Sequence, residues 1–399
     1  MSYDIGVIGL GLAGTLAALK LAENKNIKVI AFDLGRKWAK RRRQLDGFLG
    51  ALPNSDGKLY LNNISDVSKV TNEQKSQSAF EYFNKLLSNV GEFSIIKDKS
   101  PNKSILNKIK KINYDITLND YIQLIPKDIH LLSKYIANIL ENSGIKFQFD
   151  TEVDKIDKQE DMFVIFSEGQ EFRCKKLIMA VGRSGWRWAK EIYSKFNIIE
   201  NNDIAKFGIR LEMNSNLLKD FNESVCTLTK SGFKIGPLCW YGTVIPEDHV
   251  DMAISAFRSN ENRWKTDKVS FNLIGERIFP NKGFEQTDRI GKLTFVLSND
   301  RIAKEKISNI INNKSNISVI PEFNWLKEAI TELSIINPEI LTKAYFHVPT
   351  ITPIIPQISF NENFETKMDG LFAIGESSGI TGLLSAGLMG IICANSILK

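Results

Sequence analysis

Cysteine is scarce in this chain, and no two cysteines lie close together. The 399 residues include four of them, Cys174, Cys226, Cys239 and Cys393, with no C-x-x-C pair. This spacing argues against a redox disulfide between near neighbours and against a zinc ribbon, so we name no metal ligands. A charged leader with a cleavage site is also lacking before the first apolar strand. We therefore expect a reduced, cytoplasmic setting.

Long uncharged runs are scarce as well. One run, residues 379–398, is long enough to span a membrane, but its glycines and polar side chains favour a buried helix over a membrane span. The composition is 43% apolar and 25% charged, which is ordinary for a globular protein with a large core. The net charge of +6 is not by itself a nucleic-acid signature.

The N-terminus contains a glycine pattern in an informative context. A buried strand, residues 4–8, runs into Gly9-Leu10-Gly11-Leu12-Ala13-Gly14 and then into an apolar helix. In a dinucleotide fingerprint, Gly9 permits the tight turn, Gly11 lets the pyrophosphate approach the backbone, and Gly14 lets helix and strand pack closely. The helix N-terminus offers free N–H groups to the phosphates. A second strand ends at Asp33, where an acid would accept the adenosine-ribose hydroxyls and disfavour NADP.

Two loops follow this unit. Residues 36–43 form the most basic run of the chain, including Arg42 and Arg43. Because the run follows the second strand, we place contacts with the cofactor or an anionic substrate first, a solvated loop second and nucleic acid third. Residues 47–60 are rich in small residues, Ser55 and Gly57 among them, and would let backbone come close to a flat ligand.

Later segments predict an α/β fold in which the first domain is discontinuous. The strand at residues 177–181 runs into Gly182, and the strand at 370–374 runs into Gly375 and Glu376, followed by a final helix. Hairpin-length spacing after residue 204 predicts a second, largely antiparallel β domain that would bind substrate. We assign residues 1–65, 127–203 and 366–399 to a Rossmann-type dinucleotide-binding domain, 66–126 to an inserted helical or mixed segment, and 204–365 to the substrate domain.

The chain resembles FAD-dependent oxidoreductases with the glutathione-reductase type of Rossmann domain. Within that group it is most similar to the poorly characterised FAD-dependent (NAD(FAD)-utilising) dehydrogenases. Five stretches carry the resemblance: the N-terminal fingerprint, the glycine-rich loop with Ser-Asp-Gly-Lys-Leu at residues 50–59, the strand end and turn at 180–185, the Gly-x-Arg-x-Glu strand at 208–212, and the C-terminal Ala-Ile-Gly-Glu at 373–376. It covers both domains in motif order, but not residues 66–125.

The resemblance implies FAD as the cofactor. It implies that Gly9, Gly11 and Gly14 hold the pyrophosphate and that Asp33 binds the adenosine ribose. It also implies that the backbone of Val153 pairs with adenine and that the chain at Gly182 passes close to the adenosine half of the cofactor. Glu376, after Gly375, replaces the usual aspartate that binds the ribitol hydroxyls. The last helix, starting near Gly382 and Leu383, would direct its N–H groups at the flavin O2, where reduced flavin is negative.

Candidate catalytic residues are Asp56, Lys58 and His347. Each has a plainer interpretation as a structural or surface residue; for His347 the alternatives are a proton donor near the flavin and a satisfied structural histidine. Trp186-Arg187-Trp188 resembles the W-x-W motif of flavin halogenases, but Lys190 and Glu191 replace its Ile-Pro, so we reject that assignment.

The expected function is FAD-dependent hydride transfer between flavin N5 and a small polar or anionic substrate. Because the chain has no second G-x-G-x-x-G, electrons would come from the substrate itself, from NAD(P)H bound without a Rossmann site, or from a protein donor. The alternatives are a flavin enzyme that modifies tRNA or a nucleobase, and a dinucleotide-binding protein without catalysis. We expect no membrane partner.

Overall fold

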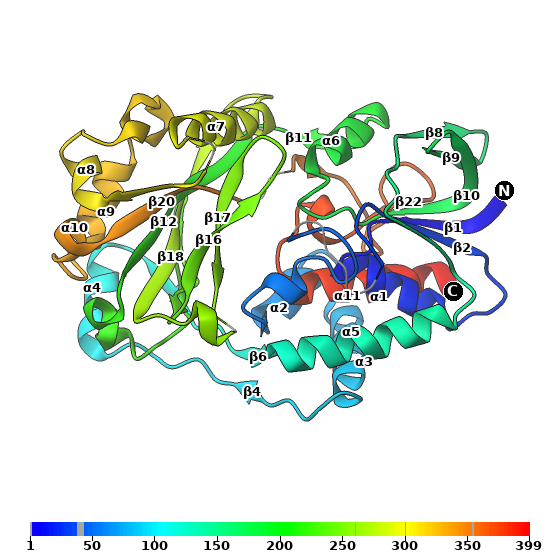
Figure 1. Ribbon diagram of the computed structural model, residues 1–399, viewed down its shortest axis with the longest axis horizontal. Coiled ribbons are helices and arrows are strands. Elements are labelled where there is room, and N and C mark those ends of the chain that lie inside the picture. Colours follow the sequence, from blue (N-terminus) through cyan, green and yellow to red (C-terminus); the bar gives the residue numbers. More distant parts are fainter. Residues whose placement is uncertain (1, 38–43, 260, 300, 353–354) are drawn as a thin grey trace. The chain divides into compact units, whose positions relative to one another are not determined.

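The computed structural model describes residues 2–37, 44–259, 261–299, 301–352 and 355–399. It divides into two compact units (Figure 1). Unit 1 comprises residues 1–95, 122–201 and 355–399, and unit 2 comprises residues 96–121 and 202–354. The chain thus leaves the first unit twice, and residues 66–126 contribute to both. Arg42 and Arg43 lie outside the described residues.

Unit 1 is built on a parallel sheet that confirms the predicted α/β fold. The parallel strands run in the order β7 (Lys146–Phe149), β2 (Val29–Asp33), β1 (Ser2–Ile8), β10 (Gln170–Met179) and β22 (Leu371–Ala373). Two antiparallel strands, β8 (Lys155–Gln159) and β9 (Met162–Ser167), extend from the first half of β10. Strand β2 is buried at every position, as expected for a strand covered on both faces.

Helices cover both faces of this sheet. One face packs against α1 (Leu12–Leu21), α2 (Asn62–Ser68), α3 (Glu73–Ser88), α5 (Pro126–Glu141) and α11 (Leu383–Leu398). The other packs against α6 (Trp186–Lys195) through residues such as Ala189 and Tyr193. Helices α1 and α11 lie side by side (Figure 1). Most of α11 is buried, and among the described residues no helix is both long and apolar enough to span a membrane.

Short elements complete unit 1. The turn η1 (Leu52–Asn54) precedes β3 (Lys58–Tyr60), η6 (Gly375–Ser378) lies between β22 and α11, and β11 (Ile199–Asn201) pairs with β21 (Gln357–Ile358). Strands β4 (Ile95–Ile96) and β6 (Tyr121–Gln123) stand where the chain passes from one unit to the other.

Unit 2 is organised around an antiparallel sheet, which confirms the predicted second architecture. Its order is β19 (Ala303–Lys306), β20 (Tyr345–Ile351), β12 (Ile204–Asn214), β18 (Lys268–Ile278), β14 (Phe233–Ile235), β13 (Thr227–Lys230) and β5 (Asp115–Thr117), with β15 (Cys239–Trp240) also on β18. A separate hairpin joins β16 (Thr243–Asp248) and β17 (Ala253–Arg258). The helices are α4 (Lys103–Lys111), α7 (Gly283–Leu297), α8 (Ile307–Ile311), α9 (Leu326–Leu333) and α10 (Ile340–Lys343).

The two faces of this sheet differ in character because side chains alternate along a strand. On β12, Phe207, Ile209 and Leu211 are fully buried and point to the face where Phe207 meets Phe323 edge-on. Arg210 and Glu212 point to the opposite face and are also buried. Burial of charged side chains along one strand is unusual and marks that face for closer inspection.

Candidate functional site

The predicted cofactor residues of unit 1 meet at one edge of the parallel sheet. Because neighbouring parallel strands end at the same edge, the chain segments that leave β1, β2, β7, β10 and β22 converge there. The residues at or just beyond these ends are Gly9, Asp33, Val153, Gly182 and Glu376. The carboxyl edge of a doubly wound sheet is where such folds bind nucleotides.

The glycine turn is closed by backbone contacts on both sides. Gly9 has a φ of 93°, and a Cβ added to it would lie 2.4 Å from the carbonyl oxygen of Ala180. A Cβ on Gly14 would lie 1.9 Å from the carbonyl oxygen of Gly9. No side chain longer than a hydrogen fits at either position, as the close helix–strand packing of a fingerprint requires.

Gly11 differs because a Cβ there would make an ordinary van der Waals contact and no clash. A Cβ there would meet nothing nearer than Gly50 Cα at 3.8 Å. Gly11 is also the N-cap of α1, and no side chain caps that helix. No side chain thus competes with an anion for the first-turn N–H groups of α1, and Gly11 is the one glycine of this turn at which a Cβ would not clash.

Asp33 is buried, with 7% of its surface exposed, and the glycine turn is hydrogen-bonded to it. Its Oδ2 accepts a hydrogen bond from the N–H of Leu10 (2.6 Å), and its Oδ1 accepts one from the N–H of Gly35 (2.6 Å). Burial raises the pKa of Asp33, while these backbone bonds oppose the rise. A carboxylate has about four acceptor positions, so Asp33 can hold the turn and still accept from a ribose hydroxyl.

Glu376 stands in η6 and is paired with Arg183, for which sequence analysis predicted no role. Arg183, which follows Gly182, donates from Nε to Glu376 Oε1 over 2.9 Å. Each residue directly follows a strand-end glycine on neighbouring strands β10 and β22, and that symmetry was a signal available in the sequence. The ion pair fixes the Glu376 side chain at the sheet edge.

The N-terminus of α11 lies in the same part of unit 1. Gly375 adjoins the first turn of α1, since a Cβ on it would lie 3.0 Å from that of Ala13. Gly382, the N-cap before Leu383, offers no side-chain cap and has a φ of 116°. A Cβ on Gly382 would lie 2.4 Å from Oδ1 of Asn63, so α2 also reaches this point. Three helices that follow strands of this sheet edge, α1, α6 and α11, begin without a side-chain cap. Of these, α1 is linked to the segment before α11 by the contact between Gly375 and Ala13.

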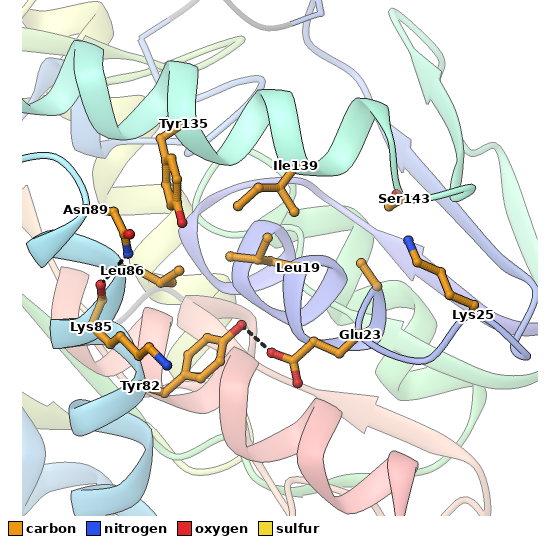
Figure 2. A pocket seen from close by; sticks show the side chains of 11 residues that line it. Leu19, Glu23, Lys25, Tyr82, Lys85, Leu86, Asn89, Tyr135, Ile139 and Ser143 are labelled. Carbon is orange, nitrogen blue, oxygen red and sulfur yellow. Dashed lines mark hydrogen bonds between the residues drawn. The ribbon is translucent and has the colours of Figure 1, made fainter.

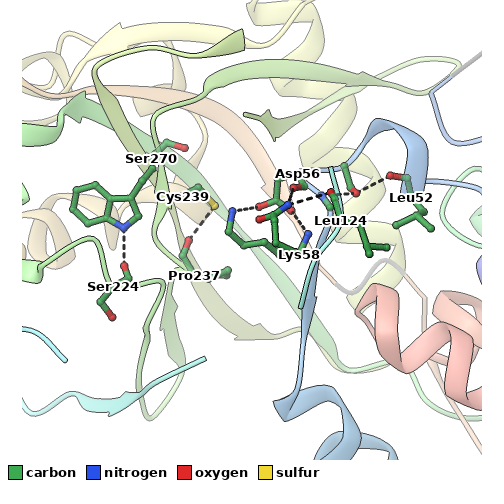
Figure 3. A network of polar contacts seen from close by, with 12 residues as sticks. Leu52, Asp56, Lys58, Leu124, Ser224, Pro237, Cys239 and Ser270 are labelled. Atoms are coloured by element: carbon green, nitrogen blue, oxygen red, sulfur yellow. Dashed lines mark hydrogen bonds and ion pairs between the residues drawn. The ribbon is translucent and has the colours of Figure 1, made fainter. Parts of the chain in front are cut away.

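Asp56, just before β3, and Lys58, the first residue of β3, form an ion pair with each other (Figure 3). Lys58 Nζ lies 3.0 Å from Asp56 Oδ2, and both side chains are largely buried. Ser55 Oγ accepts from the N–H of Gly57 (3.0 Å), and Gly57 lies against the carbonyl of Leu124. The structure thus brings these four predicted residues together in one hydrogen-bonded loop.

His347 lies in unit 2, in a buried network of charged side chains. Its Nε2 is 3.1 Å from Oε2 of Glu212, and both residues are less than 5% exposed. Lys304 Nζ binds Glu212 Oε2 over 2.6 Å, and Lys268 Nζ is 3.4 Å from Oε1. The sequence offered His347 and the Gly-x-Arg-x-Glu strand separately, and the sheet brings them together.

The network fixes the protonation of this pair. Burial alone would raise the pKa of Glu212, but hydrogen bonds from His347 and Lys304 outweigh it and lower that pKa to about 2. Burial lowers the pKa of His347, against the opposing effect of Glu212. Glu212 is therefore ionised and His347 neutral at pH 7. An ionised carboxylate only accepts, so Nε2 carries the imidazole proton and Nδ1 is left as an acceptor.

This protonation predicts how stability depends on pH. The folded-state pKa of His347 lies below its unfolded value of 6.5, so its contribution is fully present above pH 6.5 and is lost as pH falls through the folded pKa. H347Q keeps a donor for Glu212 but does not titrate. We expect the urea midpoint of the wild type to fall more steeply than that of H347Q between pH 7 and 5.5. Parallel curves would show that His347 carries no such linkage.

A cavity of about 390 Å³ lies elsewhere in unit 1 (Figure 2). It is lined by α3, α5 and the C-terminal end of α1, and Tyr82 Oη there donates to Glu23 Oε1 over 2.8 Å. Because the glycine turn adjoins the opposite end of α1, this cavity is not the cradle formed by the strand ends. None of the predicted site residues lines it.

The parallel sheet, the glycine turn and the strand-end acids define unit 1 as a nucleotide-binding domain of the Rossmann type. The sequence profile of the pyridine nucleotide-disulphide oxidoreductase family matches residues 104–195. That match covers less than half of the chain and leaves out the N-terminal glycine turn. No curated protein sequence matches the chain.

Several solved flavoenzyme structures are similar over nearly the whole chain. Halogenase PltM has 13% identity and a TM-score of 0.47, covering 99% of this chain and 69% of its own. Glycine oxidase from Geobacillus kaustophilus has 14% identity and a TM-score of 0.42, covering 100% and 95%. The p-nitrophenol 4-monooxygenase PnpA from Pseudomonas putida DLL-E4 has 10% identity and a TM-score of 0.42, covering 100% and 79%. At these values the likenesses carry no argument about activity.

Proposed function

We propose that this protein is an FAD-dependent oxidoreductase that acts on a small polar or anionic substrate. The observation that carries the proposal is that α1 and α11 both begin without a side-chain cap, while Gly375, shortly before α11, adjoins Ala13 in the first turn of α1. A dinucleotide needs one such terminus for its pyrophosphate. A second terminus suits a flavin, because reduced flavin is negative in its pyrimidine ring. The family match over residues 104–195 is in keeping with this.

Different residues of unit 1 would bind different parts of the cofactor. The backbone at Gly11 and the first turn of α1 would receive the pyrophosphate, and Asp33 the adenosine-ribose hydroxyls. Arg183 occupies Oε1 of Glu376, which leaves Oε2 to accept from the ribitol chain. The residues present therefore fit the group. The FAD would supply hydride transfer at N5, while the protein binds and orients it.

The proposal can be tested by finding which compound donates electrons to the flavin. A panel of NADH, NADPH and small organic acids is added to the FAD-loaded protein without oxygen, and the loss of flavin absorbance is followed. We expect at least one member to reduce the flavin within the range of enzymatic turnover, on the order of one per second or faster. A bound flavin that no donor reduces would instead identify a dinucleotide-binding protein without catalysis.

A further inference from the structure

The polar face of the unit 2 sheet carries a row of side chains from four adjacent strands. Lys304 on β19 pairs in register with His347 on β20, His347 pairs with Arg210 on β12, and Arg210 pairs with Asn272 on β18. Directly opposed residues on neighbouring strands project from the same face with Cβ atoms about 5 Å apart. The four side chains therefore form a continuous line, with Glu212 two residues beyond Arg210 on the same face.

Three members of this row have buried polar atoms without a partner among the described residues. They are Arg210 Nε, His347 Nδ1 and Asn272 Oδ1. Arg210 is only 7% exposed, yet within the described part of the chain its side chain donates a single hydrogen bond, from Nη1 to Ser270 Oγ (3.2 Å). It forms no ion pair there. A buried guanidinium without an anion is costly, and so are orphaned acceptors, which points to a ligand that satisfies both.

The chemistry of the row defines that ligand. Arg210 and Lys304 of the row, together with Lys268 beside Glu212, supply three positive charges. The single negative charge is that of Glu212, since His347 is neutral. This excess favours an anion. Because Glu212 holds the proton of His347 on Nε2, the Nδ1 of His347 is an acceptor. Oδ1 of Asn272 is an amide carbonyl oxygen and is also an acceptor. The ligand must then combine an anionic group for Arg210 with a neighbouring O–H or N–H donor.

We propose that this row binds the carboxylate and adjacent hydroxyl of a 2-hydroxy acid. The carboxylate takes the Arg210 guanidinium, and the hydroxyl donates to His347 Nδ1 or Asn272 Oδ1. A 2-amino acid fits less well because its ammonium group would add positive charge to a site that already carries an excess. Lys304 and Lys268 have side chains that are 43% and 38% exposed, so the row reaches solvent on that side. As a substrate assignment the inference rests on the proposed function, but the binding itself requires no flavin.

Calorimetric titration of the full-length protein, with and without added FAD, tests the proposal. The ligands are lactate, propionate (which lacks only the hydroxyl), alanine and inorganic phosphate. We expect lactate to bind about tenfold or more tighter than each of the others, because propionate leaves buried acceptors unpaired. Failure of FAD binding with lactate binding intact would overturn only the flavin assignment. If lactate binds no better than propionate, alanine or phosphate, the 2-hydroxy acid is wrong.

Three variants separate this role from a structural one. R210M is expected to weaken lactate binding at least about tenfold, because a charge-assisted hydrogen bond is lost. N272A is expected to weaken lactate binding but not propionate binding. The control R277M removes an arginine that lies on the opposite face of the same sheet, stacked on Trp325. It should leave lactate affinity within about twofold.

Stability gives an independent readout. Removal of an unpaired buried charge should leave the urea midpoint of R210M unchanged or higher. A lower midpoint for R210M, or undiminished lactate binding by it, would overturn the proposal.

Discussion

G11V is expected to bind FAD at least about 100-fold more weakly than the wild type, a loss of about 2.8 kcal/mol, while remaining folded. The backbone of Gly11 has a φ of −60°, which any residue adopts, and a Cβ there meets no atom nearer than 3.8 Å. The valine side chain would instead fill the space that we assign to the pyrophosphate. The change therefore acts on the ligand and not on the fold. Equilibrium titration of flavin fluorescence measures it.

A matched glycine elsewhere supplies the control. Gly169, in the turn between β9 and β10, also has open space around its Cβ position, but its φ is 74°. G169A should lower stability by about 1 kcal/mol through backbone strain and leave FAD affinity unchanged. G11A should fall between the wild type and G11V. If G11V binds FAD as tightly as the wild type, the pyrophosphate does not lie at this turn.

E212Q is expected to lower the local stability of the unit 2 sheet by about 2 kcal/mol. Glu212 is 3% exposed and accepts from His347, Lys304 and Lys268 at once. Removing one partner of a buried ion pair costs ~3–5 kcal/mol. The expected loss is smaller here because both lysines are more than a third exposed and can turn to solvent. Hydrogen exchange of amides in β12 and β20 reports this change.

Glu276 provides the comparison on the same sheet. It pairs with Lys206 over 2.8 Å, but both side chains are more than a third exposed. E276Q should therefore change the same protection by less than about 0.5 kcal/mol. Equal losses in E212Q and E276Q would show that the buried network contributes no more than a surface ion pair.

Much of unit 1 was predictable because its signals are local. Each parallel strand is a short apolar run that stops at a glycine or an acid, as at Gly9, Asp33 and Gly182. Because these strands are parallel, all their carboxyl ends lie on one edge of the sheet. Hairpin-length spacing of the later strands likewise indicated the antiparallel sheet of unit 2. Local sequence patterns were therefore enough to predict which residues of unit 1 lie at the shared strand ends.

The pairings that depend on register were not predictable. Strand β20 lies more than a hundred residues after β12, and a register irregularity between them decides that His347 opposes Arg210. A shift by one residue would turn the histidine to the other face. The pairing of Arg183 with Glu376 likewise joins segments 193 residues apart. The sequence named His347 and Glu376 but could not supply their partners.

The assignment of residues 66–126 to a domain could not be predicted from the sequence either. Their polar, lysine- and asparagine-rich composition suggested one inserted segment. In the structure α3 packs in the core of unit 1 through Phe83 and Leu87, while β5 pairs with β13 in unit 2. Composition describes how a segment meets solvent, and it carries little information about which of two cores a segment joins.

The central claim, that unit 1 binds FAD, is tested most directly by the stoichiometry of cofactor binding. Purified full-length protein is incubated with FAD or NAD, freed of unbound ligand, and assayed for bound nucleotide by absorbance. We expect about one FAD per chain with a flavin spectrum, and little bound NAD, because a Rossmann domain of this type holds a single dinucleotide. A protein that remains colourless after incubation with FAD, or that retains NAD in its place, would contradict the account.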